Sequence, residues 1–302
     1  MKSGQVGGHE GVGIVAQIGP SCQASGVKIG ERVGIKWVAS ACGNCMPCLA
    51  GADGICSNLE VSGYTCPGTF QEYALAPAHY VTPIPDGLES EVAAPLLCGG
   101  VTVYSALRKS RAQAGDWVVI AGAGGGLGHL GVQLGGKGMG FRIIGLDLGA
   151  KESFVKEGGA EAFIDIAKYP IDDGSKDIAD EILAITSGVG AAAAIICSGS
   201  NDAYSQALSF LRFNGTMVCV GVPGEAKPIA NAYPHLMVGK QLAIVGSTVG
   251  NRRDAMETLA MAQRVATTPF RLEKIQNITR VFEDMKGGKL QGRVVLDQQS
   301  WT

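Results

Sequence analysis

The sequence contains no apolar run long enough to cross a membrane, and it carries little net charge. Apolar stretches such as Ala191 to Cys197 are short and flanked by Gly and Ser, whereas a membrane-spanning helix needs about 20 apolar residues. The formal charge of −2 gives no basic surplus for nucleic acid or anionic membranes. The start of the chain lacks the patterns of secretory signals and transit peptides. We therefore expect a cytoplasmic protein with small-molecule partners, and neither nucleic acid nor a membrane among them.

No sequence repeat and no low-complexity stretch accounts for the unusual glycine content. The 302 residues include 45 glycines, which are scattered without a fixed period among Val, Ile, Leu and Ala. That distribution indicates tight turns of an α/β protein rather than collagen or a solenoid. The length exceeds that of a typical single domain, so we expect two compact units that share a cleft.

The sequence pattern changes near residue 101. Before it, Gly, Pro and short alternating stretches (12–18, 32–35, 70–75) predict a β-rich lobe. After it, strands and helices alternate, which predicts a doubly wound parallel sheet covered on both faces. Strands are expected at 117–121, 142–147, 162–164, 192–197 and 216–220, and helices at 101–109, from 126, near 152, at 178–186 and at 204–211. The helices 252–266 and 279–286 and the strand 293–296 are expected to return to the first lobe.

Nine cysteines in a reducing compartment do not form a disulfide framework, and four of them follow a metal-binding spacing. Cys42, Cys45, Cys48 and Cys56 form a C-x2-C-x2-C-x7-C loop. Four thiolates at such short spacings can surround one tetrahedral zinc ion, and a site with no open position is structural. An iron–sulfur cluster uses the same ligands, and four ordinary thiols are the remaining alternative.

A glycine-rich turn joins a predicted strand to a predicted helix. The segment 121–128 reads AGAGGGLG, and Asp147 closes the next predicted strand. Glycines let the backbone approach a pyrophosphate, and the helix N-terminus offers N–H groups to it. Asp147 can accept both ribose hydroxyls of NAD, whereas the 2′-phosphate of NADP would meet like charge. An Asp in an ordinary turn is the alternative reading.

His9 and Glu10 lie in a glycine-flanked block, and Cys98 precedes the first helix of the alternating region. Imidazole and thiolate suit zinc, and a zinc ion held by these residues would sit beside a nicotinamide. On spacing alone, a histidine near an N-terminus is usually a surface residue, and a cysteine in an apolar run is usually part of the core.

These residues together resemble a known family. The chain closely resembles the microbial, fermentation-type zinc alcohol dehydrogenases of the medium-chain dehydrogenase/reductase superfamily, from Gly7 to about Asp297. The matching blocks are GGHEG (7–11), GIKW (34–37), the cysteine loop, SGYT (62–65), CGGVTVYSAL (98–107), AGAGGGLG (121–128), GSTVGNRR (246–253) and GRVVLD (292–297).

The resemblance implies a Rossmann-type domain at 99–249 and a GroES-like catalytic domain at 1–98 and 250–302. It implies that His9 and Cys98 are ligands of a catalytic zinc, with the acid Glu10 beside the metal, and that the four cysteines hold a structural zinc. It also implies that Trp37 limits the pocket to short alcohols. The coenzyme-binding residues that it implies are Thr102, Gly125, Gly126, Leu127, Asp147, Lys151, Ile166, Ser198, Val220, Val222, Ser247, Val249 and Arg293.

One departure from the family lies at the front of the chain. Family members carry a longer segment before the GGHEG block, which holds another zinc-ligating cysteine, a Thr or Ser that touches the alcohol, and a proton-relay histidine. We therefore expect an N-terminally truncated chain, with an incomplete GroES-like domain and a catalytic zinc site lacking one ligand. Cys22 and Cys66 do not match ligand positions. His79, His129 and His235 also lie outside the motifs and are expected to be surface or structural residues.

The function expected from the resemblance is zinc- and NAD-dependent interconversion of a short-chain primary alcohol and its aldehyde by a homo-oligomer, a tetramer in the family. Truncation would impair that activity. Two alternatives stay open: a non-catalytic NAD-binding remnant, and a zinc-free quinone reductase of the same superfamily, which the cysteines and His9 disfavour.

Overall fold

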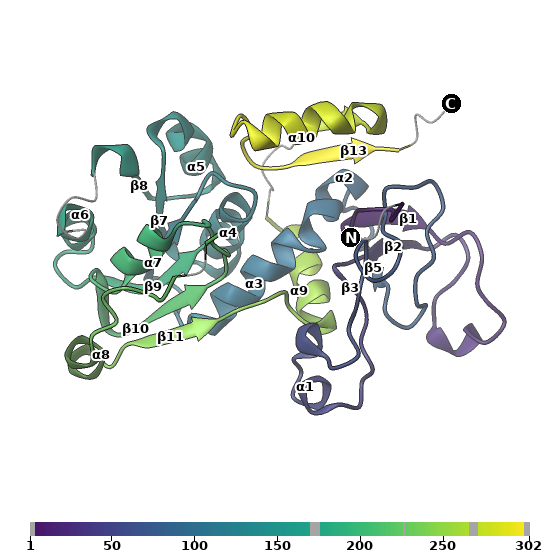
Figure 1. Cartoon of the computed structure of the whole chain (residues 1–302), viewed down its shortest axis with the longest axis horizontal. Helices are drawn as coiled ribbons and strands as arrows, with labels where there is room; N and C mark the ends of the chain where they lie inside the picture. Colours follow the sequence, from purple (N-terminus) through teal and green to yellow (C-terminus); the bar gives the residue numbers. More distant parts are fainter. Residues whose placement is uncertain (1–3, 170–175, 226, 266–270, 299–302) are drawn as a thin grey trace. The chain divides into compact units, whose positions relative to one another are not determined.

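The computed structural model describes residues 4–169, 176–225, 227–265 and 271–298 (Figure 1). The chain forms two compact units. Unit 1 comprises Met1–Val101, Val249–Arg264 and Pro269–Thr302, and unit 2 comprises Thr102–Thr248 and Val265–Thr268. Residues 99–101, which we expected in the coenzyme-binding domain, belong to unit 1.

Unit 2 is built on a six-stranded parallel sheet, which confirms the predicted architecture. The strand order is β11-β10-β9-β6-β7-β8. The strands are β6 (Trp117–Ala121), β7 (Arg142–Asp147), β8 (Ala162–Asp165), β9 (Ala191–Ile196), β10 (Leu211–Cys219) and β11 (Ala243–Gly246). The chain runs from β6 outward through β7 and β8 and then returns to the other side of β6. The sheet therefore has its switch point between β6 and β9, where ligands bind in folds of this type.

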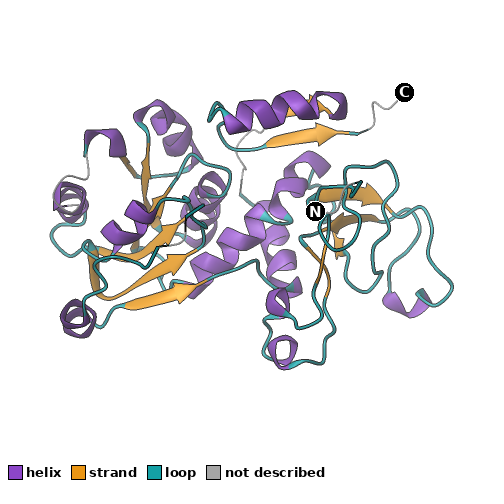
Figure 2. Cartoon of the chain, viewed as in Figure 1, coloured by secondary structure: helices purple, strands orange, loops and turns teal. Residues whose placement is uncertain are grey.

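Helices cover this sheet (Figure 2). Successive residues of its central strands point to opposite faces and are buried, so both faces are covered. On one face, Val119 and Ile144 pack with Ile182 and Leu208 in a single core cluster. The neighbouring Ile120 points the other way, because a Cβ placed at Gly131 would lie 3.4 Å from its Cδ1. Burying each such side chain stabilises the fold by about 1.5–3 kcal/mol.

The helices of unit 2 follow the strands in sequence. They are α3 (Gly99–Lys109, which begins in unit 1), α4 (Gly128–Gln133), α5 (Glu152–Gly158), α6 (Lys176–Ile185), α7 (Asn201–Ala207) and α8 (Pro234–Lys240). The helix α4 continues directly into a π-helical turn, η4 (Leu134–Gly138). The helix α8 and the strand β11 were not predicted from the sequence, and α4 begins two residues later than expected.

The described residues of unit 1 form three small sheets. The strands β1 (Gly11–Ile14), β2 (Arg32–Ile35) and β5 (Thr82–Pro83) form an antiparallel sheet. The strand β3 (Val38–Ser40) pairs with β4 (Glu60–Val61), and β12 (Arg271–Lys274) runs parallel to β13 (Val294–Asp297). The helices of unit 1 are α1 (Met46–Leu49), α2 (Ser90–Ala93), α9 (Arg252–Ala262) and α10 (Ile278–Lys286).

One predicted strand of unit 1 is wrong. Residues 70–75 alternate in polarity, yet they form bends and an irregular segment, and Leu75 is 98% exposed. No strand in the described ranges pairs with them, so the alternation is not supported by a hydrogen-bonded ladder. The strand predicted at 12–18 ends early, at Ile14.

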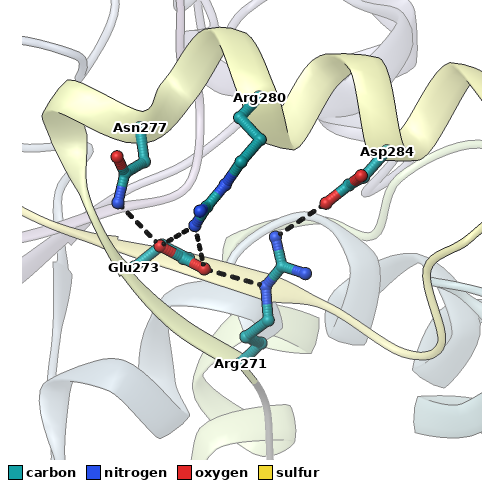
Figure 3. A network of polar contacts seen from close by, with 5 residues as sticks. All are labelled: Arg271, Glu273, Asn277, Arg280 and Asp284. Carbon is teal, nitrogen blue, oxygen red and sulfur yellow. Dashed lines mark hydrogen bonds and ion pairs between the residues drawn. The ribbon is translucent and has the colours of Figure 1, made fainter.

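A polar network ties α10 to β12 (Figure 3). The carboxylate of Glu273, whose side chain is 14% exposed, accepts from Arg280 at 2.8 Å and from Asn277 at 2.9 Å. It also pairs with Arg271 at 3.2 Å, and Arg271 reaches Asp284 at 3.2 Å. Three partners on one partly buried carboxylate fix the helix on its strand.

Within the described residues, no helix by itself is long and apolar enough to cross a membrane. The helices at 90–96 and 99–109, bent by 51°, pass that test of length and composition only as a pair.

Candidate coenzyme and metal sites

The four cysteines of the loop come together in unit 1. Their sulfur atoms all lie within 4.8 Å of one another. The Sγ of Cys56 is 3.5 Å from that of Cys42 and 3.7 Å from that of Cys45. Left-handed backbone at Gly43 (φ 72°) and Gly51 (φ 74°) lets the short loop turn back on itself. This donor set fits one tetrahedral zinc ion.

Backbone amides around the loop prepare two of its thiols for metal binding. The amide of Cys48, followed by that of Ser57, lowers the pKa of Cys45 to about 6. The amide of Asn44 lowers the pKa of Cys42. Burial raises the pKa of Cys48 to about 12. The thiolate is the form that binds metal, so Cys45 and Cys42 are the cysteines that ionise most easily for metal binding. A bound cation would stabilise the thiolate of Cys48 and so favour its ionisation.

Hydrogen bonds link the cysteine loop to the start of α9 and to Tyr80, which lies just before β5. The Asn251 side chain donates to the Gly51 carbonyl at 2.9 Å. The Asp53 carboxylate accepts from the Tyr80 hydroxyl and, at 3.4 Å, from the Arg252 amide. The contacts from Asn251 and Arg252 join segments about 200 residues apart in the chain. The loop is thereby part of the framework of unit 1.

Sequence reasoning missed a buried lysine beside this framework. Lys36, from the GIKW block, is 4% exposed, and its Nζ donates to the Tyr80 carbonyl at 2.7 Å. Burial, reinforced by the Arg252 charge and opposed by that of Asp53, lowers the pKa of Lys36 to about 7. The side chain also lies over the Tyr80 ring, 4.2 Å from its centroid. A buried lysine in a β-rich lobe has no sequence pattern that reveals it.

His9, Glu10, Cys98 and Trp37 all belong to unit 1. Glu10 accepts from the Gly99 amide at 2.9 Å, directly beside Cys98, and pairs with Arg293 at 3.3 Å. The His9 ring meets Trp37 edge-on at 4.9 Å. The pKa of His9 is lowered, first by burial; Arg293 lowers it further and Glu10 opposes the shift. An imidazole kept neutral is the form that binds metal.

The predicted catalytic ligands do not form a tight cluster. Within residues 4–169, 176–225, 227–265 and 271–298, the cysteine quartet is the only group of three or more His, Cys, Asp or Glu side chains that could hold a metal ion. Both Glu10 oxygens already have partners. A third aromatic, Tyr64, completes a cluster that the sequence did not reveal, because it lies 4.8 Å from Trp37 and 6.2 Å from His9.

The glycine-rich turn of unit 2 lies at the switch point of the sheet. It begins after β6 with Gly122 in left-handed backbone (φ 77°), and the Gly125 amide donates to the Gly122 carbonyl at 3.0 Å. A Cβ placed at Gly128 would lie 2.0 Å from that carbonyl oxygen. The turn can therefore close only with glycine at this position, as is typical of turns that bind a pyrophosphate.

Asp147 ties this turn to the end of β7. It is 6% exposed; one oxygen accepts from the Gly124 amide at 2.8 Å, and the other accepts from the Leu148 amide at 2.8 Å and pairs with Lys151 at 3.2 Å. A Cβ at Gly124 would lie 2.7 Å from the Lys151 stem. The structure thus brings Asp147, Lys151 and the turn together.

Ser198 follows β9 on the other side of the switch point. Its hydroxyl is buried and has no hydrogen-bond partner among the residues that the structure describes. A Cβ at Gly122 would lie 3.2 Å from the Ser198 Cβ, and a Cβ at Gly221 would lie 2.1 Å from its carbonyl oxygen. This unpaired hydroxyl beside a cradle of glycines fits a polar ligand such as a dinucleotide.

The remaining residues predicted to bind the coenzyme differ in their exposure, and they are divided between unit 1 and unit 2. Thr102 and Ser247 are buried, and Ser247 accepts from Lys109 at 3.2 Å. Ile166 is 39% and Val222 86% exposed. Gly125, Gly126, Leu127 and Val220 are half-buried in unit 2, whereas Val249 and Arg293 belong to unit 1.

Of the three histidines outside the motifs, His79 and His235 are exposed, but His129 is only 5% exposed. It lies in the first turn of α4, and its Nδ1 is 2.8 Å from the Gly125 carbonyl oxygen.

Two family models match the chain. The zinc-binding dehydrogenase model matches residues 126–264, and the model of the alcohol dehydrogenase GroES-like domain matches residues 1–86. Together they cover the β-rich N-terminal part of unit 1, most of unit 2 and α9.

Curated relatives and solved structures agree with these models. The chain is 59% identical to alcohol dehydrogenase 2 of Emericella nidulans over 98% of this chain and 82% of the relative. It is 41% identical to an alcohol dehydrogenase of Schizosaccharomyces pombe over 97% of this chain and 81% of the relative. The crystal structure of the Aeropyrum pernix alcohol dehydrogenase matches with a TM-score of 0.83 and 28% identity, over 98% of this chain and 84% of that one.

Proposed function

Because the chain belongs to the zinc-dependent alcohol dehydrogenases of the medium-chain dehydrogenase/reductase superfamily, we propose that it interconverts short-chain primary alcohols and their aldehydes with NAD. The observation that carries the coenzyme assignment is the glycine turn at the switch point, held by Asp147. NAD supplies the hydride acceptor, and the protein binds and orients it.

Asp147 supports NAD rather than NADP as the coenzyme. Its carboxylate is buried at the end of β7, where the family motif places the acid that binds the adenosine ribose. A 2′-phosphate at this position would face a like charge. Three contacts already occupy the carboxylate, so the ribose hydroxyls would share it with Lys151, whose ammonium can itself donate to a hydroxyl.

Two zinc sites form part of the proposal. The cysteine quartet would hold a structural zinc, and His9 and Cys98, with Glu10 beside them, would contribute to a catalytic one. A catalytic zinc, when bound, lowers the pKa of the alcohol oxygen. The residues present do not form a compact donor set at that second site, so we derive no step through the metal.

The side chains around His9 have roles of their own. Trp37 and Tyr64 present aromatic surfaces next to the imidazole, and such bulk favours small, unbranched alcohols. The Glu10 carboxylate holds the Gly99 amide and thereby positions the backbone next to Cys98. A cytoplasmic location and assembly into a homo-oligomer, both expected from the sequence, remain part of this proposal.

The test is an NADH-absorbance assay of the purified, zinc-supplemented chain with ethanol and, as a bulky control, a branched secondary alcohol. We expect NADH formation with ethanol and much less with the branched alcohol. NADH binding without turnover of either alcohol would favour a non-catalytic NAD-binding protein. A chain that binds no NADH would contradict the proposal as a whole.

A further inference from the structure

The coenzyme turn is rich in glycine and therefore costly to order. Residues 122–128 contain five glycines and only two residues with side chains, Ala123 and Leu127. Glycine loses more conformational freedom on folding than any other residue. Hydrogen bonds from outside the turn must therefore fix its shape before it can bind a ligand tightly.

His129 makes such a bond from a buried position. Its Nδ1 lies 2.8 Å from the Gly125 carbonyl oxygen, which also accepts from the His129 backbone amide at 3.2 Å. A carbonyl oxygen only accepts, so Nδ1 must carry the proton. The ring is held in place from outside the turn by Phe154 of α5, whose centroid is 5.8 Å away.

The contact between His129 and the Gly125 carbonyl also sets the direction of the Gly126 N–H. The peptide bond between Gly125 and Gly126 is planar and trans, as no cis bond occurs in the described chain, so its N–H points opposite to its carbonyl. With the Gly125 carbonyl drawn toward His129, the Gly126 N–H points away from α4. The side-chain bond adds to the bond from the His129 backbone amide, and without these two bonds glycine would let the peptide flip at little steric cost.

We propose that His129 is a positioning residue that orients the Gly125–Gly126 peptide and thereby sets the affinity of the turn for a dinucleotide. This inference rests on the proposed coenzyme function of the turn. His129 acts through Gly125 and need not contact the coenzyme itself. The ligand class is a pyrophosphate-containing dinucleotide, because the groups that His129 orients are backbone amides.

Three substitutions separate positioning from packing. His129→Asn keeps a donor nitrogen at the same distance along the side chain, His129→Gln moves it one bond further, and His129→Leu removes it. We expect NADH to bind His129→Leu and His129→Gln about fivefold more weakly than the wild type, which is the loss of one neutral hydrogen bond. His129→Asn should bind within about twofold of the wild type.

Calorimetric titration with NADH gives the dissociation constants, and thermal unfolding of the same samples gives their stability. His235→Asn, at an exposed histidine, is the matched control and should change neither. If His129→Leu does not fold, the NADH affinities of His129→Asn and His129→Gln still show whether the hydrogen bond to Gly125 matters. Equal NADH affinity of the Asn and Gln variants, whatever their stability, would overturn the inference. A wild type that binds no NADH would overturn the proposed function and this inference with it.

Discussion

The buried amine of Lys36 predicts an unusual dependence of stability on pH. The pKa of Lys36 is lowered from 10.5 to about 7 in the folded chain, chiefly by burial. Between these values the unfolded chain binds about one proton more than the folded chain. The free energy of unfolding should therefore rise with pH by about 1.4 kcal/mol per unit from this group alone. The penalty for burying the charge is fully present below pH 7 and disappears as pH rises toward 10.5.

Lys36→Met isolates this effect, because methionine has a similar shape and does not titrate in this range. The substitution removes the hydrogen bond to the Tyr80 carbonyl, which shifts stability by an amount that does not depend on pH. The difference between wild type and variant should nevertheless change with pH. From pH 7.5 to pH 9, we expect the wild type to gain about 2 kcal/mol relative to Lys36→Met.

Urea unfolding at several pH values, with saturating zinc throughout, measures this difference. Titration of the cysteines is common to both proteins and cancels in the subtraction. The matched control is Lys28→Met, at an exposed lysine, whose difference from the wild type should be flat. A flat difference for Lys36→Met as well, or one in which the wild type loses stability as pH rises, would refute the reasoning.

Three further predictions concern the coenzyme, the metal and the polar network of α10. NAD should bind at least about tenfold more tightly than NADP in calorimetry, and Asp147→Asn should reduce that ratio; equal affinities in the wild type would remove the role of Asp147. Elemental analysis should find zinc retained by the cysteine loop, and Cys45→Ser with Cys48→Ser should abolish retention; unchanged zinc content would place the metal elsewhere. Glu273→Gln should lower the free energy of unfolding by about 1–2 kcal/mol in urea titrations, and an unchanged midpoint would mean that the network is only a surface feature.

The sheet of unit 2 was predictable because its strands are buried on both faces. Residues 117–121 and 142–147 are nearly continuous apolar runs between turn signals, and the structure has β6 and β7 at these positions. The edge strand β11 was missed because four residues, Ala243–Gly246, carry too little pattern. The segment 70–75 was misread because alternation signals a strand only when a neighbouring strand is there to pair with it.

Functional residues could likewise be predicted where their geometry is set by nearby sequence, and not where it depends on tertiary contacts. The cysteine quartet could be found because its geometry is set by spacing within a single short loop. Lys36 could not be found, because its burial and its partner, 44 residues away, exist only in the folded chain. His129 was expected to be a surface or structural residue, and the sequence could not decide between the two: its bond to Gly125 is local, but its burial depends on the packing of α4 and α5.

Glu10 shows how the structure constrains roles that sequence resemblance assigns one residue at a time. The resemblance places Glu10 beside the catalytic metal and Arg293 at the coenzyme pyrophosphate, but in the structure the two form an ion pair across 283 positions of sequence. The second Glu10 oxygen accepts from the Gly99 amide, next to Cys98. Movement of this carboxylate toward a metal would break charge-assisted hydrogen bonds worth about 1.5–3 kcal/mol each. Movement of Arg293 toward a pyrophosphate would remove the charge that partly offsets Glu10. The two predicted roles are therefore energetically linked, because either residue would have to break the ion pair between Glu10 and Arg293 before it could take up its predicted role.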